Sequence, residues 1–334
     1  MSKENKGLQD KLKNFFKGLN KGPRPPRPGE YLILTEELEN DLRPESPLPV
    51  RLKAVKEINE VAKVRRLENF AVEKLWELLQ DLLKPEVARE TRHVIFGLFT
   101  TLCQFQLDKS GYLRTKFFNF IKGHNVEEDA GPKFEFLKAL TDNGRDVSYF
   151  DDRMAPLMLS WMGGPHSLKK TGDFMIFLNN FLKFNQSLVD QEILASIIQN
   201  VCYIACTSAS RQDTLECLKA LETVFCYGSL PSNSLSTFLA TLCRTVNVEF
   251  LCQQSWKMVR NLLHTDLGHS GLMTMCDFMK IVERNNDDYT VVRGAVFFVG
   301  VALWGSNMVR TLKYSPSMVL SSFAEVSAQK YCLR

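Results

Sequence analysis

Apolar residues recur every three or four positions along the chain from Leu48 onward, with short polar, Gly or Pro segments between them. This spacing puts apolar side chains on one face of an α-helix, and no segment alternates convincingly at the two-residue period of a strand. The expected helices cover residues 50–64, 70–83, 85–105, 112–121, 132–143, 149–162, 173–184, 191–206, 213–227, 234–246, 249–263, 271–282 and 290–305. The sequence therefore predicts an all-α protein.

The expected helices form pairs that repeat about every 40 residues, which is the size of HEAT or armadillo repeats. The pairs are expected to begin near residues 50, 86, 130, 166, 211, 249 and 288. The helices are apolar over more than half of their circumference, as expected when each one packs on its partner and on the neighbouring pairs. We therefore predict an α-solenoid of about seven HEAT/armadillo-like repeats, with a generic helical bundle as the alternative. Solenoids offer long surfaces to other proteins and rarely enclose a catalytic pocket.

Residues 1–29 are predicted to be a basic amphipathic helix followed by a Pro-rich linker. Residues 1–28 contain eight Lys or Arg and two acidic residues, a balance of 8 − 2 = +6. The helix could lie on an anionic membrane or dock on a partner, or it could pack loosely on its own body. The segment GPRPPRPGE favours polyproline II and is predicted to be a stiff linker. A membrane-recruitment module is therefore an alternative function, with the candidate membrane-surface residues Lys11, Lys13, Phe15, Phe16 and Lys17.

The composition limits the classes of partner and the cellular compartment. The 42 Lys+Arg and 38 Asp+Glu leave a net charge of +4, too small to favour nucleic acid as a partner. Nine cysteines without a CxxC motif indicate reduced thiols in a cytosolic or nuclear protein. No signal-peptide pattern is visible. The longest uncharged apolar run, residues 294–305, is about 12 residues long against the roughly 20 that span a bilayer, so it is expected to be a buried helix.

Motifs for binding a nucleotide or a metal are weak. The segment GPHSLKKT, residues 164–171, has Lys169 where a phosphate loop has its second Gly, and no strand precedes it. A zinc site would have the right ligand order but the wrong spacing, so cysteines in the core and a histidine at a helix end are the favoured interpretation. The residues concerned are Cys243, Cys252, His264 and His269.

Motifs for catalysis are equally weak. Cys276 with His269 could form a thiol nucleophile, but both lie in an apolar pattern that predicts a packed helix. The acidic pairs at 151–152 and 287–288 stand where helices begin, and there carboxylates cap amide groups and favour the helix dipole. GxSxG, HExxH and a Gly-rich loop after a strand are all missing from the sequence. We predict a non-enzyme with no catalytic residue, cofactor, metal or small-molecule substrate.

The segment KALTDNGRDVSYF, residues 138–150, is the most conspicuous polar interruption. Asn143-Gly144 readily adopts positive φ and is predicted to end a helix. Asp146 or Ser148 is expected to cap the next helix. Because such a connection does not itself require Arg145, this side chain is a candidate contact.

Several segments resemble the N-terminal region of the tuberin family. They are ALTDNGR (139–145), TLCRTVNV (241–248), CQQSWKMVRNLLHTDLGHS (252–270), RGAVFFVGVALWG (293–305) and, more weakly, EVAKVRRLENFAVEKLWELLQDLLKPE and NNFLKFN. The resemblance covers residues 30–323 and implies a HEAT-like α-solenoid that binds hamartin, largely through hamartin's coiled coil. In this family a C-terminal GTPase-activating domain for Rheb restrains mTOR signalling, and that domain is absent from this sequence.

Residues 324–334 depart from the family and form a divergent tail. We expect an alternatively spliced or incomplete product, with exposed apolar surface near Val319, Leu320 and Phe323. The resemblance also implies a cytoplasmic scaffold that is peripheral at lysosomal or other membranes as part of the tuberous sclerosis complex.

Outward-facing Lys, Arg and aromatic side chains are the candidate partner contacts of the predicted solenoid, and four arginines represent them. For each, a salt bridge within the solenoid or a contact at a helix C-terminus is the alternative interpretation. They are Arg145, Arg244, Arg260 and Arg293.

Overall fold

The computed structural model describes residues 34–68, 70–106, 111–163, 171–280 and 289–304. All regular elements within these ranges are α-helices or short 3-10 helices. The chain divides into two compact units, one ending at Lys109 and the other beginning at Ser110. Several predicted features lie outside the described residues: the tail 1–29, nearly all of GPHSLKKT, the acidic pair 287–288, and the segment with Val319, Leu320 and Phe323.

The first unit holds a short helix followed by the first helices of the repeat pattern. Its elements are α2 (Glu36–Leu42), α3 (Leu48–Ala62), α4 (Ala71–Leu79), η1 (Gln80–Leu83) and α5 (Arg89–Phe105). The buried Arg51 of α3 ties them together, because its guanidinium pairs with Asp81 at 2.7 Å and donates to the carbonyls of Leu42 and Leu78. A buried arginine is stable when its donors are met in this way.

The prediction that Pro85 opens the third helix is wrong by four residues. Helix α5 begins at Arg89, and the guanidinium of Arg92 donates to the carbonyls of Pro85 and Val87. Those carbonyls are therefore held in a turn before the helix.

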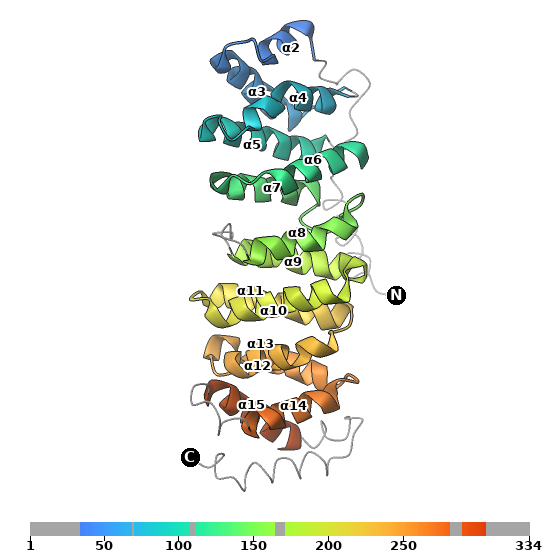
Figure 1. Cartoon of the computed structure of the whole chain (residues 1–334), viewed down its shortest axis with the longest axis vertical. Helices are drawn as coiled ribbons and strands as arrows, with labels where there is room; N and C mark the ends of the chain where they lie inside the picture. The colour runs from blue at the N-terminus through green and yellow to red at the C-terminus, as the bar shows by residue number, and fades with distance from the viewer. Residues whose placement is uncertain (1–33, 69, 107–110, 164–170, 281–288, 305–334) are drawn as a thin grey trace, which may run out of the picture. The chain divides into compact units, whose positions relative to one another are not determined.

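The second unit is a stack of helices in two layers. Its elements are α6 (Gly111–Gly123), η2 (Glu127–Asp129), α7 (Ala130–Leu140), α8 (Asp151–Gly163), α9 (Thr171–Asn185), η3 (Gln186–Leu188), α10 (Gln191–Thr207), α11 (Arg211–Tyr227), η4 (Ser232–Ser234), α12 (Leu235–Thr245), α13 (Glu249–Leu263), α14 (Gly268–Lys280) and α15 (Tyr289–Trp304). One layer places α9 against α11 and α11 against α13, and the other stacks α8, α10, α12 and α14 in order (Figure 1). Helix α7 joins the first layer, because the ring of Phe134 lies 5.4 Å from that of Phe177 on α9.

The predicted period of about 40 residues is confirmed. Helices that open successive repeats begin at Leu48, Arg89, Ala130, Thr171, Arg211, Glu249 and Tyr289. The protein is an all-α solenoid. Each helix in the stack buries the apolar residues that recur along it, such as Phe174, Phe177 and Phe181 on α9.

The last described helix departs from regular stacking. Helix α15 packs on α12 as well as on α14. Gly294 makes this possible, because a Cβ atom there would overlap the carbonyl of Cys243 on α12. The amide of Asn247 fixes the same junction by donating to the carbonyl of Thr290 at 2.8 Å.

The apolar run 294–305 forms most of α15, and Ala295, Phe298, Val299 and Ala302 are buried. The prediction that this run forms a buried helix is confirmed over its described residues. None of the helices in the described ranges combines the length and the apolarity needed to cross a bilayer.

Candidate protein-binding surface

The connection between α7 and α8 begins with three residues in the left-handed region. Asp142, Asn143 and Gly144 have φ of 47°, 55° and 86°. The amide of Asn143 donates to the carbonyl of Lys138 at 2.7 Å, which satisfies the end of α7. The predicted positive φ at Asn143-Gly144 is confirmed, and the structure adds Asp142.

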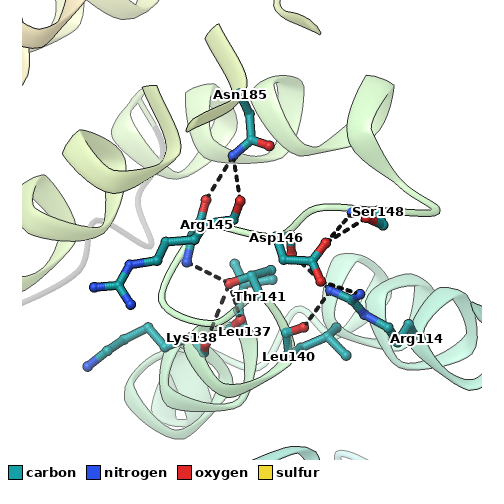
Figure 2. Close-up of polar contacts among 10 residues, drawn as sticks. Arg114, Leu137, Lys138, Leu140, Thr141, Arg145, Asp146, Ser148 and Asn185 are labelled. Carbon is teal, nitrogen blue, oxygen red and sulfur yellow. Dashed lines mark hydrogen bonds and ion pairs between the residues drawn. The ribbon is translucent and has the colours of Figure 1, made fainter. Parts of the chain in front are cut away.

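Gly144 is required by packing as well as by its backbone conformation. A Cβ atom at this position would lie 2.8 Å from the carbonyl oxygen of Phe177 on α9. The buried hydroxyl of Thr141 accepts from the amide of Gly144 at 2.9 Å and donates to the carbonyl of Leu137 at 2.7 Å (Figure 2). The tight turn is thus fixed from within by a single side chain.

Helix α9 holds the same connection from the next repeat. The side-chain amide of Asn185 donates to the carbonyls of Gly144 and Arg145 at 3.1 and 3.2 Å (Figure 2). Asn180, earlier on α9, donates to the carbonyl of Asn143 at 3.1 Å. Because both anchors bind backbone carbonyls, they fix the path of the loop and leave its side chains available.

Helix α6 also holds this connection. The guanidinium of the buried Arg114 binds the carboxylate of Asp146 at 2.7 Å and the carbonyl of Leu140 at 3.0 Å (Figure 2). Partial burial alone would raise the pKa of Asp146, but hydrogen bonds from Ser148 and Arg114, with the guanidinium charge, hold that pKa below its ordinary value.

The expectation that Asp146 or Ser148 caps the next helix is wrong. The carboxylate of Asp146 accepts from the amide and the hydroxyl of Ser148, and α8 begins only at Asp151. One oxygen of the carboxylate therefore closes a turn before the helix. The other oxygen accepts from Arg114.

The side chain of Arg145 takes no part in the hydrogen bonds that hold the connection. Its side chain is 51% exposed, and its charged contact is with Asp142 at 3.6 Å, whose own side chain is more exposed still. Such an exposed pair adds little stability. Arg145 therefore stays a candidate contact.

The other three candidate arginines are also exposed, on different helices. Arg244 lies in the last turn of α12 and donates to the thiol of Cys206 at 3.6 Å. Arg260 lies in the last turn of α13, and Arg293 lies on α15. The contact of Gly294 with Cys243 places the backbones beside Arg293 and Arg244 next to each other. Arg145 belongs to an earlier repeat and does not share that junction.

The sequence interpretation missed an exposed group at the ends of α9 and α11, which we term the Lys183 cluster. The ammonium of Lys183 lies 5.7 Å from the ring centre of Phe184 and 5.3 Å from that of Tyr227. Phe184, Tyr227 and Leu188 are 55%, 56% and 52% exposed. No clear signal for it existed in the sequence, because Phe184 stands three residues after Phe181 and seven after Phe177, a spacing that predicts a place on the same apolar face.

Comparison with known proteins assigns the family. A family model described as "Domain of unknown function (DUF3384)" matches residues 48–332. The chain belongs to this family. The Tuberous sclerosis 2 protein homolog of Schizosaccharomyces pombe is 21% identical over 274 residues, which are 75% of this chain and 20% of that protein. The chain therefore spans about a fifth of the length of this curated relative.

A solved structure of the TSC2 N-terminus has the same fold as this DUF3384 chain. The TM-score is 0.76 at 20% sequence identity, and the match covers 87% of this chain and 76% of that one. The resemblance to the tuberin N-terminal region that the sequence predicted is thereby confirmed, and at this identity the structural likeness concerns the fold.

The residues considered for metal binding and catalysis lie in different environments in this DUF3384 chain. Cys243 is buried, Cys252 is half-buried and His264 is exposed, so the proposed zinc ligands differ in environment. No group of three or more His, Cys, Asp or Glu able to hold a metal occurs in the described ranges. Burial raises the pKa of Cys276 to about 11, so its thiol stays protonated at neutral pH.

Proposed function

We propose that this chain is a non-catalytic scaffold that binds hamartin and so helps to form the tuberous sclerosis complex. The observation that carries the proposal is the match of 87% of the chain to the fold of the TSC2 N-terminus. The relatives' names connect this fold with tuberous sclerosis proteins. The partner itself comes from the resemblance to the tuberin family.

The structure is compatible with a scaffold because side chains fix the connections between its helices. The connections between helices are held by side chains that bind backbone carbonyls, as Asn185 and Arg114 do. Solvent-facing side chains such as Arg145 and Tyr227 are thereby presented from a fixed backbone. A preorganised surface loses little conformational freedom on binding, which favours its use as an interface.

In this proposal the complex activates GTP hydrolysis by Rheb and restrains mTOR signalling through a C-terminal domain outside this chain. The role of the present chain is then assembly, in the cytoplasm and, with the rest of the complex, at lysosomal or other membranes. Adding the chain alone to GTP-loaded Rheb is expected to leave the hydrolysis rate unchanged, and a clear acceleration would overturn the non-catalytic role.

Binding is tested by mixing the 334-residue chain with the purified hamartin coiled coil at micromolar concentration and separating the mixture by size. The two are expected to elute together, ahead of either protein alone. An unrelated coiled coil of equal length is the control for nonspecific association. Complete separation of the chain from hamartin would refute the proposed function.

A further inference from the structure

The C-terminal ends of α7, α9 and α11 lie side by side in the second unit. Asn185, the last residue of α9, binds the carbonyl of Arg145 just after α7. Gln186, which follows α9, donates to the carbonyl of Val224 near the end of α11 at 2.9 Å. The exposed side chains that follow these helices therefore belong to one continuous edge of the unit.

The Lys183 cluster gives this edge an aromatic and cationic centre. Within the described residues, the Lys183 ammonium lies over these two rings, and no carboxylate pairs with it. A cation in the last turn of a helix is favoured by the helix dipole, which explains the lysine. The dipole does not explain why the side chains of Phe184, Tyr227 and Leu188 are about half exposed.

Acidic residues that lie near Leu188 and Tyr227 in the sequence are engaged in other contacts. The carboxylate of Asp190 caps α10 by accepting from the amides of Glu192 and Ile193. Glu222 on α11 binds Lys257 at 2.9 Å and the amide of Gln254 at 2.8 Å. The remaining carboxylate is that of Asp142, which lies 3.6 Å from the guanidinium of Arg145. The edge therefore offers the charges of Lys183 and Arg145 to a partner.

The backbone beneath this edge is tightly fixed. Gly228 follows α11 and lies against the side-chain amide of Gln186, where any larger residue would overlap it. The same amide donates to the carbonyl of Val224, and the backbone of Gly144 packs against the carbonyl of Phe177. Ordering the edge on binding therefore costs only the freedom of a few side chains.

We infer that the edge formed by Arg145, Lys183, Phe184, Leu188 and Tyr227 docks an amphipathic helix that carries carboxylates beside aliphatic side chains. The two rings and Leu188 supply apolar contact area, and an ammonium held over aromatic rings keeps its outer side for a carboxylate. An anionic bilayer fits less well, because recognition of acidic lipid usually uses clusters of four or more basic residues. The inference rests on the proposed function for the identity of the helix, which is then a strand of hamartin's coiled coil.

The first test compares Lys183→Glu with Lys122→Glu. Both lysines are exposed and lie in the last turn of a helix, so both substitutions lose the same dipole interaction, but Lys122 ends α6 away from the edge. We expect the Kd for the hamartin coiled coil to rise about tenfold for Lys183→Glu and to stay near the wild-type value for Lys122→Glu.

The second test removes an aromatic ring without changing charge. Tyr227→Ala is expected to raise the Kd about tenfold, whereas Tyr203→Ala, a more exposed ring on α10 in the other layer, is expected to leave it unchanged. Melting temperatures of all four variants are measured in parallel. If Lys183→Glu fails to fold, the tyrosine pair decides the question.

The outcomes separate the two proposals. If the wild-type chain does not bind the coiled coil, the proposed function fails. If it binds and the edge variants bind as tightly as their controls, the edge is overturned while the proposed function stands. If the edge variants instead lose only binding to phosphatidylserine vesicles, the edge is a membrane surface and the inference is wrong.

Discussion

The guanidinium of Arg114 lies 2.7 Å from the carboxylate of Asp146, and this ion pair links α6 to the connection that follows α7. Arg114 is buried, whereas Asp146 is half-exposed. The arginine also donates to the carbonyls of Leu140 and Asp146. Its main structural contribution is therefore to satisfy backbone carbonyls at the end of one helix from its neighbour.

Arg114→Ala is expected to lower the free energy of unfolding by about 3 kcal/mol, because it leaves buried carbonyls without a donor and removes a buried charge partner. Urea denaturation followed by circular dichroism measures the change. Arg145→Ala, in the same connection, is the matched control and is expected to change stability by less than about 0.5 kcal/mol because its side chain is exposed. Equal losses in the two variants would contradict this division of roles.

The lowered pKa of Asp146 predicts a pH dependence with a definite sign. The folded-state pKa lies below the ordinary value of 3.8, so the folded state favours the ionised carboxylate. The stability that this provides is fully present above the unfolded-state pKa and is lost as the pH falls through the folded-state pKa. The difference in unfolding free energy between the wild type and Asp146→Asn is therefore expected to be largest near pH 7 and to shrink toward pH 3. A difference that grows on acidification would show that the sign is wrong.

Much of the solenoid could be predicted because apolar spacing is a local property. Helix starts near 130, 211, 249 and 288 were expected within a residue or so of those observed. Helix α2 was missed because its seven residues bury only Leu42, which is too little to show a period. The start of α5 was misplaced because the side chain of Arg92, rather than Pro85, decides where the turn ends.

The candidate surface was less predictable, because it depends on residues far apart in the chain. The sequence indicated a turn at Asn143-Gly144 and an uncommitted Arg145. It could not indicate that Asn185 would hold the loop or that Lys183 would face Tyr227, since those contacts depend on how α9 stacks against its neighbours. An exposed aromatic residue becomes informative only when the helix face it occupies is known.

The membrane role predicted for residues 1–28 is a separate matter, because those residues lie outside the described ranges. Co-sedimentation with phosphatidylserine vesicles, with and without residues 1–28, tests it. The basic and apolar composition predicts binding that requires the segment and weakens with salt. Replacing Lys11, Lys13 and Lys17 by Gln, with the apolar residues kept, is the control for charge. Equal sedimentation of the full and shortened chains would remove this function.

The junction of α15 with α12 gives the sharpest packing prediction. Gly294→Ala would drive a methyl group into the carbonyl of Cys243, so the helix can accommodate it only by moving away from α12. We expect a loss of about 3 kcal/mol in the free energy of unfolding, the upper end of the usual cost of overpacking. Gly300→Ala on the same helix meets no atom within 4 Å and is expected to leave stability unchanged or to raise it by about 0.5 kcal/mol, because alanine favours the helix. Thermal and urea denaturation of both variants measure the change. If Gly294→Ala is as stable as Gly300→Ala, α15 does not pack against the Cys243 carbonyl.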